Sequence, residues 1–100
     1  MQLDIVYKTR ALQKVCTNAE VASKKYGIRM GELIHKRVKQ LTSAKAVEDL
    51  IRLQTGRCHA LKGNRAGQYA MDLVHPYRLI FERLGDVIQI ARIVEITDYH

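Results

Sequence analysis

The sequence predicts an α+β fold: a small, mostly antiparallel β-sheet with two to three N-terminal helices packed on one face. Between residues 9 and 53, apolar residues recur every three or four positions, which is the period of an amphipathic helix. From residue 57 onward they alternate with polar residues, which is the period of a half-buried strand. Helices followed by a run of strands favour helices gathered on one sheet face, and we expect the other face to form a cleft.

Length and composition are those of a single domain spanning residues 1–100. A chain of 100 residues can bury one core without disulfides or metals. Cys16 and Cys58 lie outside any C-x-x-C spacing, so we expect two reduced, buried thiols. No apolar run approaches the roughly 20 residues that span a bilayer, and the opening residues lack the features of a signal peptide. We therefore expect a cytoplasmic protein that does not associate with membranes.

The first half begins with a short strand and continues with a helix. Alternating apolar residues predict the strand over residues 2–8, and we expect it to pair at a sheet edge. Thr9 is a candidate N-cap for the helix that follows. We expect the polar pair at residues 17–18 to interrupt this helix and Gly27 to end it.

Two further helices are predicted by the apolar stripes over residues 28–41 and 46–53. Gly56 closes the second of them. The side chains outside the first stripe give this helix a basic exposed face. They are Arg29, His35, Lys36, Arg37 and Lys39.

The second half is organised around residues 57–81, which predict strand, glycine loop, strand, tight turn and strand. The loop at residues 62–67 has turn residues at its ends and middle, with two cations between them. Pro76 cannot donate to a sheet ladder, so a new strand should begin at Tyr77. The residues expected on one face of these two strands are Tyr69, Met71, Leu73, Tyr77, Leu79 and Phe81.

Residues 87–97 predict a central or well-covered final strand, because β-branched residues dominate the segment. Simple alternation divides its side chains between two faces. Ile88, Ile90, Val94 and Ile96 fall on one face, and Gln89, Ile93, Glu95 and Thr97 fall on the other. If the alternation continues, Asp98 and His100 lie on one side and Tyr99 on the other.

The net charge of +7 is concentrated in the first two thirds of the chain. Residues 1–40, 41–67 and 68–100 carry +6, +3 and −2. The excess therefore lies on the helical part and the glycine loop, and it favours a polyanionic or acidic partner that approaches from that side. The alternative is a basic surface that only keeps the protein soluble.

Motifs for cofactors and metals are absent from the sequence. There is no P-loop, dinucleotide fingerprint, H-E-x-x-H or paired C-x-x-C motif, so we expect no nucleotide cofactor and no structural zinc. The four histidines are too scattered to predict a metal site from their spacing. What remains is a set of polar residues in the strand half: His59, Lys62, Arg65, Arg78, Asp98, Tyr99 and His100.

These residue types suit the cleavage of RNA by its own 2′-hydroxyl. That reaction needs a base near the hydroxyl, an acid at the leaving 5′-oxygen and cations on the phosphorane oxygens. Imidazole, with an ordinary pKa of about 6.5, can serve either proton role. Each residue also has a purely structural explanation: Arg78 could pair with Asp72 across the hairpin, Tyr99 could cap the core, and His100 could be a frayed terminus.

The stretch CHALKGNRAGQYAMDLVHPYRLIFE, followed by a strand ending in DYH, resembles the RelE/ParE toxin superfamily. The shared pattern is H-x-L-K-G-[DN]-R-x-G-[QW], x-R-L-x-F and a terminal D-Y-H, and within the superfamily it is most similar to HigB-like toxins of type II toxin–antitoxin systems. The specific likeness covers residues 57–100. It implies a metal-independent, ribosome-dependent mRNA endoribonuclease that inhibits translation, with the ribosome, mRNA and a helix-turn-helix antitoxin as partners.

The same resemblance implies roles in proton transfer. His100 is the leading proton-transfer group, and Asp98 orients or assists it. His59 is a second acid or base candidate.

The resemblance also implies contacts to RNA, in which Tyr99 positions a base and basic side chains bind phosphate. The residues expected to bind phosphate or RNA are Lys62, Arg65, Arg78, Lys36 and Arg37.

Two other functions are open at this stage. ParE-like members of the superfamily poison DNA gyrase without the nuclease residues, so the fold does not guarantee cleavage. A basic binding module without toxicity is the third.

Overall fold

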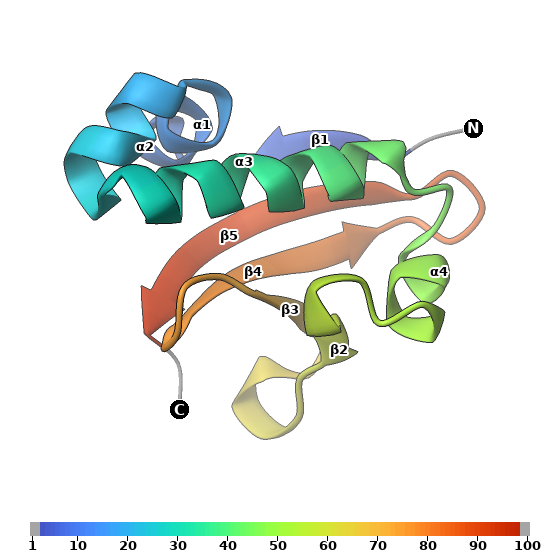
Figure 1. The fold of residues 1–100 in the computed structure, drawn as a ribbon. Helices are drawn as coiled ribbons and strands as arrows, with labels where there is room; N and C mark the ends of the chain where they lie inside the picture. The colour runs from blue at the N-terminus through green and yellow to red at the C-terminus, as the bar shows by residue number, and fades with distance from the viewer. Residues whose placement is uncertain (1–2, 99–100) are drawn as a thin grey trace.

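The computed structural model describes residues 3–98. Helices α1, α2 and α3 lie on one side of the sheet, and the short α4 lies near the β4–β5 hairpin (Figure 1). In chain order the elements are β1 (Asp4–Tyr7), α1 (Arg10–Thr17), α2 (Ala19–Tyr26), α3 (Ile28–Ser43), α4 (Val47–Arg52), the 3-10 turn η1 (Thr55–Arg57), β2 (His59–Ala60), the 3-10 turn η2 (Gly63–Arg65), β3 (Gln68–Asp72), β4 (Tyr77–Leu84) and β5 (Ile90–Asp98). No helix within this described range is long and apolar enough to cross a bilayer.

The five strands form one sheet in the order β1-β5-β4-β3-β2. Strand β1 lies at an edge and runs parallel to β5, whereas the other neighbouring pairs are antiparallel. The predicted fold class is therefore confirmed, as is the edge position of the first strand.

Side-chain caps produce the helix boundaries that the sequence predicts. The Oγ1 of Thr9 accepts a hydrogen bond from the Leu12 amide at 3.1 Å, which caps α1. The Oδ1 of Asn18 accepts from the amides of Glu20 and Val21 at 3.0 and 3.2 Å, so α2 starts afresh where α1 ends. The predicted interruption is confirmed.

The main core lies between the helices and the sheet. Its fully buried side chains include Ile34, Leu41, Met71, Leu79, Phe81 and Ile93. Cys16 and Cys58 belong to the same core and are free thiols, as predicted. Burial raises the pKa of each thiol to about 12.

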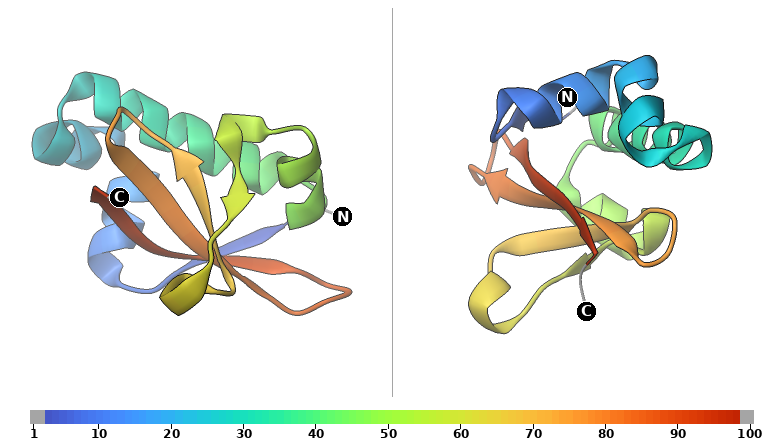
Figure 2. Two further views of the ribbon diagram at one scale, coloured as in Figure 1. Left: turned by 90° about the horizontal axis from the view of Figure 1, so that it is seen from below. Right: turned by 90° about the vertical axis from the view of Figure 1, so that its left-hand side faces the viewer.

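The opposite face of the sheet is less open than expected. Figure 2 shows the β2–β3 connection on the side of the sheet away from the helices. Its Leu61 is buried with side chains from three strands, Ala70, Ile80 and Val94. Arg65 of the same connection forms an ion pair with Glu95 on β5. The connection therefore covers part of the face that we expected to be a cleft.

A β-bulge in β5 overturns the simple alternation predicted for the last strand. Phe81 pairs with Ile93, but the preceding residue of β4, Ile80, pairs with Glu95, so Val94 is an extra residue. As a result Ile93 and Ile96 both pack on the helix side, not on opposite faces. The strand also starts later than predicted, at Ile90. Its expected first residues lie in the hairpin turn, where Val87 is 96 % exposed.

Candidate functional site

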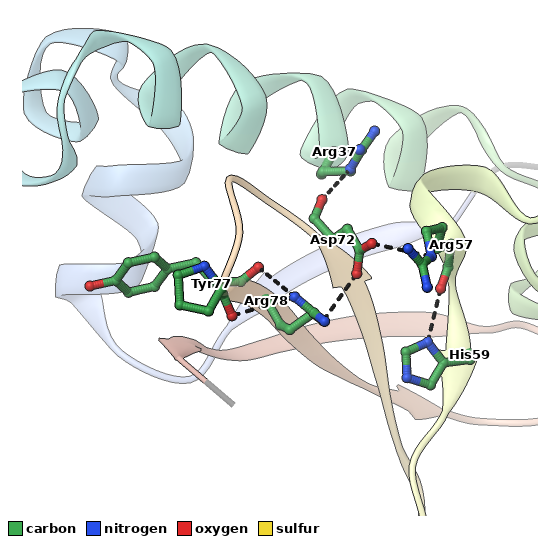
Figure 3. Close-up of polar contacts among 7 residues, drawn as sticks. Arg37, Arg57, His59, Asp72, Tyr77 and Arg78 are labelled. Atoms are coloured by element: carbon green, nitrogen blue, oxygen red, sulfur yellow. Dashed lines mark hydrogen bonds and ion pairs between the residues drawn. The ribbon is translucent and has the colours of Figure 1, made fainter. Parts of the chain in front are cut away.

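The candidate site lies where β3 ends and β4 begins. Asp72 and Arg78 are direct cross-strand partners, and the Nε of Arg78 lies 3.0 Å from Oδ1 of Asp72 (Figure 3). The Nη1 of Arg78 also donates to the carbonyls of Pro76 and Tyr77 at 3.4 and 3.3 Å. The pairing across the hairpin is thus confirmed. It holds the guanidinium of Arg78 in one orientation, with the side chain 22 % exposed.

A second arginine reaches the same carboxylate from η1. The Nε of Arg57 lies 3.4 Å from Oδ2 of Asp72, and its side chain is 84 % exposed. Its backbone is left-handed, with φ of 55°, as is that of Gln54 and Gly56. A left-handed backbone is unfavourable for residues other than glycine. Non-glycine residues that adopt it concentrate at functional sites.

His59 follows on β2 and is oriented by Arg57. Its Nδ1 lies 2.9 Å from the Arg57 carbonyl oxygen. A carbonyl only accepts, so this contact requires the hydrogen on Nδ1 and leaves Nε2 of the neutral ring with its lone pair. The imidazole is exposed and borders a hollow of about 180 Å³, lined by Gln54, Arg57, Cys58 and His59.

Arg37 connects helix α3 to the site through a contact with the backbone of Asp72. Its Nε donates to the Asp72 carbonyl at 2.6 Å, and its Nη1 donates to Oε1 of Gln40 at 3.0 Å. The same side chain lies against Gly56, where an added Cβ would come within 2.7 Å of Nε. We expected Arg37 to bind RNA, but these internal contacts favour a role in positioning Asp72 and η1.

The other predicted phosphate ligands lie outside this cluster. Lys62 is exposed immediately before η2, and its ammonium makes no hydrogen bond or ion pair within residues 3–98. Arg65 binds Glu95 and donates to Oε1 of Gln68 at 2.9 Å, so its charge is partly neutralised. Lys36 is exposed on α3. The structure therefore joins neither lysine to Arg78 by a direct contact.

The end of β5 approaches the site only in part. Asp98 is exposed and pairs with Tyr77, whose ring contacts the helix-side core. Cross-strand partners share a face of the sheet. Asp98 therefore lies on the helix-covered face with Tyr77, whereas Arg78 lies on the other face. Tyr99 and His100, which were predicted to act in catalysis, lie outside the described residues.

Three guanidinium groups thus converge on Asp72, from Arg37, Arg57 and Arg78. Sequence reasoning missed Arg57, although it directly follows a glycine and immediately precedes the stretch that carries the resemblance. No group of three or more His, Cys, Asp or Glu side chains between residues 3 and 98 is placed to hold a metal ion. The arrangement can bind an anion through guanidinium groups and transfer a proton through His59.

Known proteins share this architecture. A YoeB/ParE toxin from Agrobacterium tumefaciens superposes with a TM-score of 0.64 at 15 % identity, covering 98 % of this chain and 100 % of that one. A YoeB–YefM complex from Staphylococcus aureus gives 0.63 at 21 % identity, covering 100 % and 99 %. A YoeB dimer from Staphylococcus aureus gives 0.58 at 19 % identity, covering 100 % and 99 %.

This chain has the fold of the YoeB/ParE toxins. No protein-family model matches the sequence, and no curated protein matches it. The fold implied by the resemblance to the RelE/ParE superfamily is therefore confirmed, and the HigB-like subtype stays a prediction. At these identities the YoeB/ParE likeness concerns the architecture, and function has to be argued from the site.

Proposed function

We propose that this chain is the toxin of a type II toxin–antitoxin system and that it cuts mRNA in translating ribosomes. The fold shared with YoeB/ParE toxins supports a toxin. One observation carries the nuclease: the Arg78 guanidinium is held by Asp72 and two carbonyls. The same carboxylate contacts Arg57, whose carbonyl orients the exposed imidazole of His59 (Figure 3). Attack by a 2′-hydroxyl requires a fixed cation for the phosphorane oxygens and an oriented group for proton transfer.

The proposed reaction divides its work among few side chains. A base takes the proton of the 2′-hydroxyl, the oxygen attacks the adjacent phosphorus, and the bond to the 5′-oxygen breaks as an acid protonates it. Arg78 stabilises the charge that builds on the phosphorane oxygens, because its guanidinium is already held in place. His59 can accept or donate the proton at Nε2, whose partner nitrogen is fixed on the Arg57 carbonyl.

The remaining roles are proposed from the sequence. His100 is the leading proton-transfer partner of His59, Asp98 orients or assists it, and Tyr99 positions a base by stacking. Lys62 adds positive charge from its exposed position immediately before η2. The Lys36 side chain extends a basic surface along α3.

We propose a cognate antitoxin as the cellular partner, together with the ribosome and mRNA in the cytoplasm. One structural match is described as a heterotetrameric YoeB–YefM toxin–antitoxin complex from Staphylococcus aureus, which supports an antitoxin here. A helix-turn-helix antitoxin and a HigB-like subtype follow from the sequence resemblance.

Primer extension on a translated message tests the nuclease. The wild type should cut the message, and Arg78→Gln should slow cleavage by roughly 100-fold or more, the scale expected for losing one transition-state cation. Arg83→Gln is the matched control, because Arg83 lies on the same strand, is 29 % exposed and pairs with Glu48. Uncut message with the wild type, or equal cleavage by Arg78→Gln and Arg83→Gln, would contradict the proposal.

A gyrase-directed toxin is the second candidate, favoured by the YoeB/ParE description of one structural match. It predicts DNA damage with intact mRNA and no response to His100→Ala. Deletion of residues 98–100 separates the two further, since it should abolish mRNA cleavage while the domain stays folded.

A further inference from the structure

A second guanidinium lies beside that of Arg78, on the other oxygen of the same carboxylate. Asp72 contacts the Nε of Arg78 through Oδ1 at 3.0 Å and the Nε of Arg57 through Oδ2 at 3.4 Å (Figure 3). The Arg78 side chain is 22 % exposed and that of Arg57 is 84 % exposed. Arg78 is therefore the fixed member of the pair, and Arg57 is the accessible member.

The terminal nitrogens of this pair are available to a ligand. A carboxylate bound in the two-pronged mode occupies two N–H groups of one guanidinium, whereas the closest approach of Asp72 to each arginine is a single contact at Nε. Within residues 3–98, no hydrogen bond uses Nη2 of Arg78 or either terminal nitrogen of Arg57. These N–H groups can donate to a second anion while Asp72 keeps its contacts.

The charge of the cluster favours such an anion. Asp72, Arg37, Arg57 and Arg78 together carry a net charge of +2. Planar guanidinium groups match the oxygens of a phosphate, which can accept from two arginines at once. The ligand chemistry that fits is a phosphodiester.

The backbone of η1 presents Arg57 at a conformational cost. Gln54, Gly56 and Arg57 are all left-handed, and two of them are not glycine. This conformation also brings the Arg57 carbonyl within 2.9 Å of Nδ1 of His59. One residue thus orients the imidazole through its carbonyl and contacts Asp72, the partner of Arg78, through its side chain.

We propose that Arg57 is a second phosphate ligand, and that Asp72 is the positioning residue that holds Arg57 and Arg78 together. The proposal rests on the proposed function in that the phosphodiester belongs to RNA. A single phosphate of the strand accepts hydrogen bonds from both guanidinium groups, next to the Nε2 of His59.

The test is binding of a short single-stranded oligoribonucleotide with 2′-O-methyl groups throughout, which 2′-hydroxyl attack cannot cleave. Fluorescence anisotropy at several salt concentrations compares Arg57→Gln and Arg57→Lys with a matched control, Arg52→Gln. Arg52 is 68 % exposed on α4 and contacts one aspartate, Asp49, at 3.3 Å, so both Gln variants lose one charge and one surface ion pair. Circular dichroism confirms that each variant is folded.

We expect Arg57→Gln to weaken oligonucleotide binding by about tenfold. It should also reduce the steepness of the plot of log binding constant against log salt concentration by about 0.7, the value for one lost phosphate contact on a single strand. Arg57→Lys should retain the salt slope and lose part of the affinity, because an ammonium lacks the fork. Arg52→Gln should change neither slope nor affinity by more than about twofold. Equal effects of Arg57→Gln and Arg52→Gln, or no binding by the wild type at low salt, would overturn the proposal.

The positioning role of Asp72 is tested by a double-mutant cycle. In an Asp72→Asn background, the loss of oligonucleotide affinity caused by Arg57→Gln should shrink from about tenfold to below about threefold. The reason is that Arg57 is no longer held beside Arg78. A loss of the same size in both backgrounds would show that Asp72 does not position Arg57.

The two proposals fail in distinguishable ways. If the wild type leaves translated mRNA intact but oligonucleotide binding depends on Arg57, the nuclease is wrong and the phosphate ligand stands. If the wild type cuts mRNA and Arg57→Gln binds and cuts like Arg52→Gln, the nuclease stands and Arg57 is not a ligand.

Discussion

The arginines of the sheet differ in what their carboxylate partners leave available. Glu82 binds Arg92 through both Nε and Nη2, which occupies one side of the guanidinium fork. Asp72 instead comes closest to Arg57 and Arg78 at Nε, and no terminal nitrogen of either arginine donates a hydrogen bond to it. The first pair is a closed structural contact, whereas the second leaves donors for an external anion. Contacts between arginine and a carboxylate therefore serve different purposes on one sheet face.

Glu82→Gln should lower the free energy of unfolding near neutral pH by less than about 1 kcal/mol, because the pair is partly exposed. Hydrogen bonds from Arg92 are the main reason that the pKa of Glu82 is lowered, with help from Gln68 and Lys8. A lowered pKa stabilises the fold above the unfolded pKa of about 4.3, and this stabilisation is lost as the pH falls through the folded value.

Urea titrations at about pH 7 and about pH 3 check this expectation. The difference between the wild type and Glu82→Gln should be larger at the higher pH than at the lower one. Glu32→Gln, at an exposed position of α3, is the control. A difference of equal size at both pH values would contradict the assignment.

At the scale of elements, local signals predict boundaries well. Caps and breakers act within a few residues, so Thr9, Asn18, Gly27 and Pro76 mark the ends of helices and strands in the sequence itself. The bulge at Val94 leaves no such signal, because it is defined by the register of β5 against β4. Simple alternation therefore fails at that residue.

Asn18→Ala should lower the free energy of unfolding by about 1 kcal/mol, because one side-chain oxygen caps two amides at the start of α2. Asn18→Asp keeps an acceptor at that position and should retain most of the stability. Urea unfolding of the three proteins measures the effect. Equal destabilisation by both substitutions would mean that the cap does not set the stability of this junction.

At the scale of the whole molecule, the core joins residues that are far apart in the chain. Cys16 on α1 and Cys58 before β2 belong to one apolar cluster and are 3 % and 4 % exposed. Each thiol has a pKa raised to about 12 by burial, and the thiolate is the reactive form.

Neither cysteine of the folded protein should therefore react with a thiol reagent at about pH 8, and both should react in concentrated urea. Mass spectrometry after timed labelling counts the modified thiols. Fast modification of either one without denaturant would contradict its burial.

The candidate site combines local contacts, which the sequence predicts, with contacts between distant residues, which it does not. Asp72 and Arg78 could be paired from the sequence because a short hairpin places them in register. The contact of Arg37 with Asp72 spans 35 residues, and that of Arg57 depends on a left-handed backbone. Neither leaves a periodic pattern, so composition and spacing could not predict them.

The extra residue Val94 reverses the alternation of side chains between the two faces along β5. Before it, odd-numbered side chains such as Ala91 and Ile93 point to the helices; after it, Ile96 does. Anyone who grafts the closing segment of another protein with this fold onto this chain must join it downstream of position 94 or include the bulge. A splice that removes one residue there would turn every following side chain to the wrong side of the sheet.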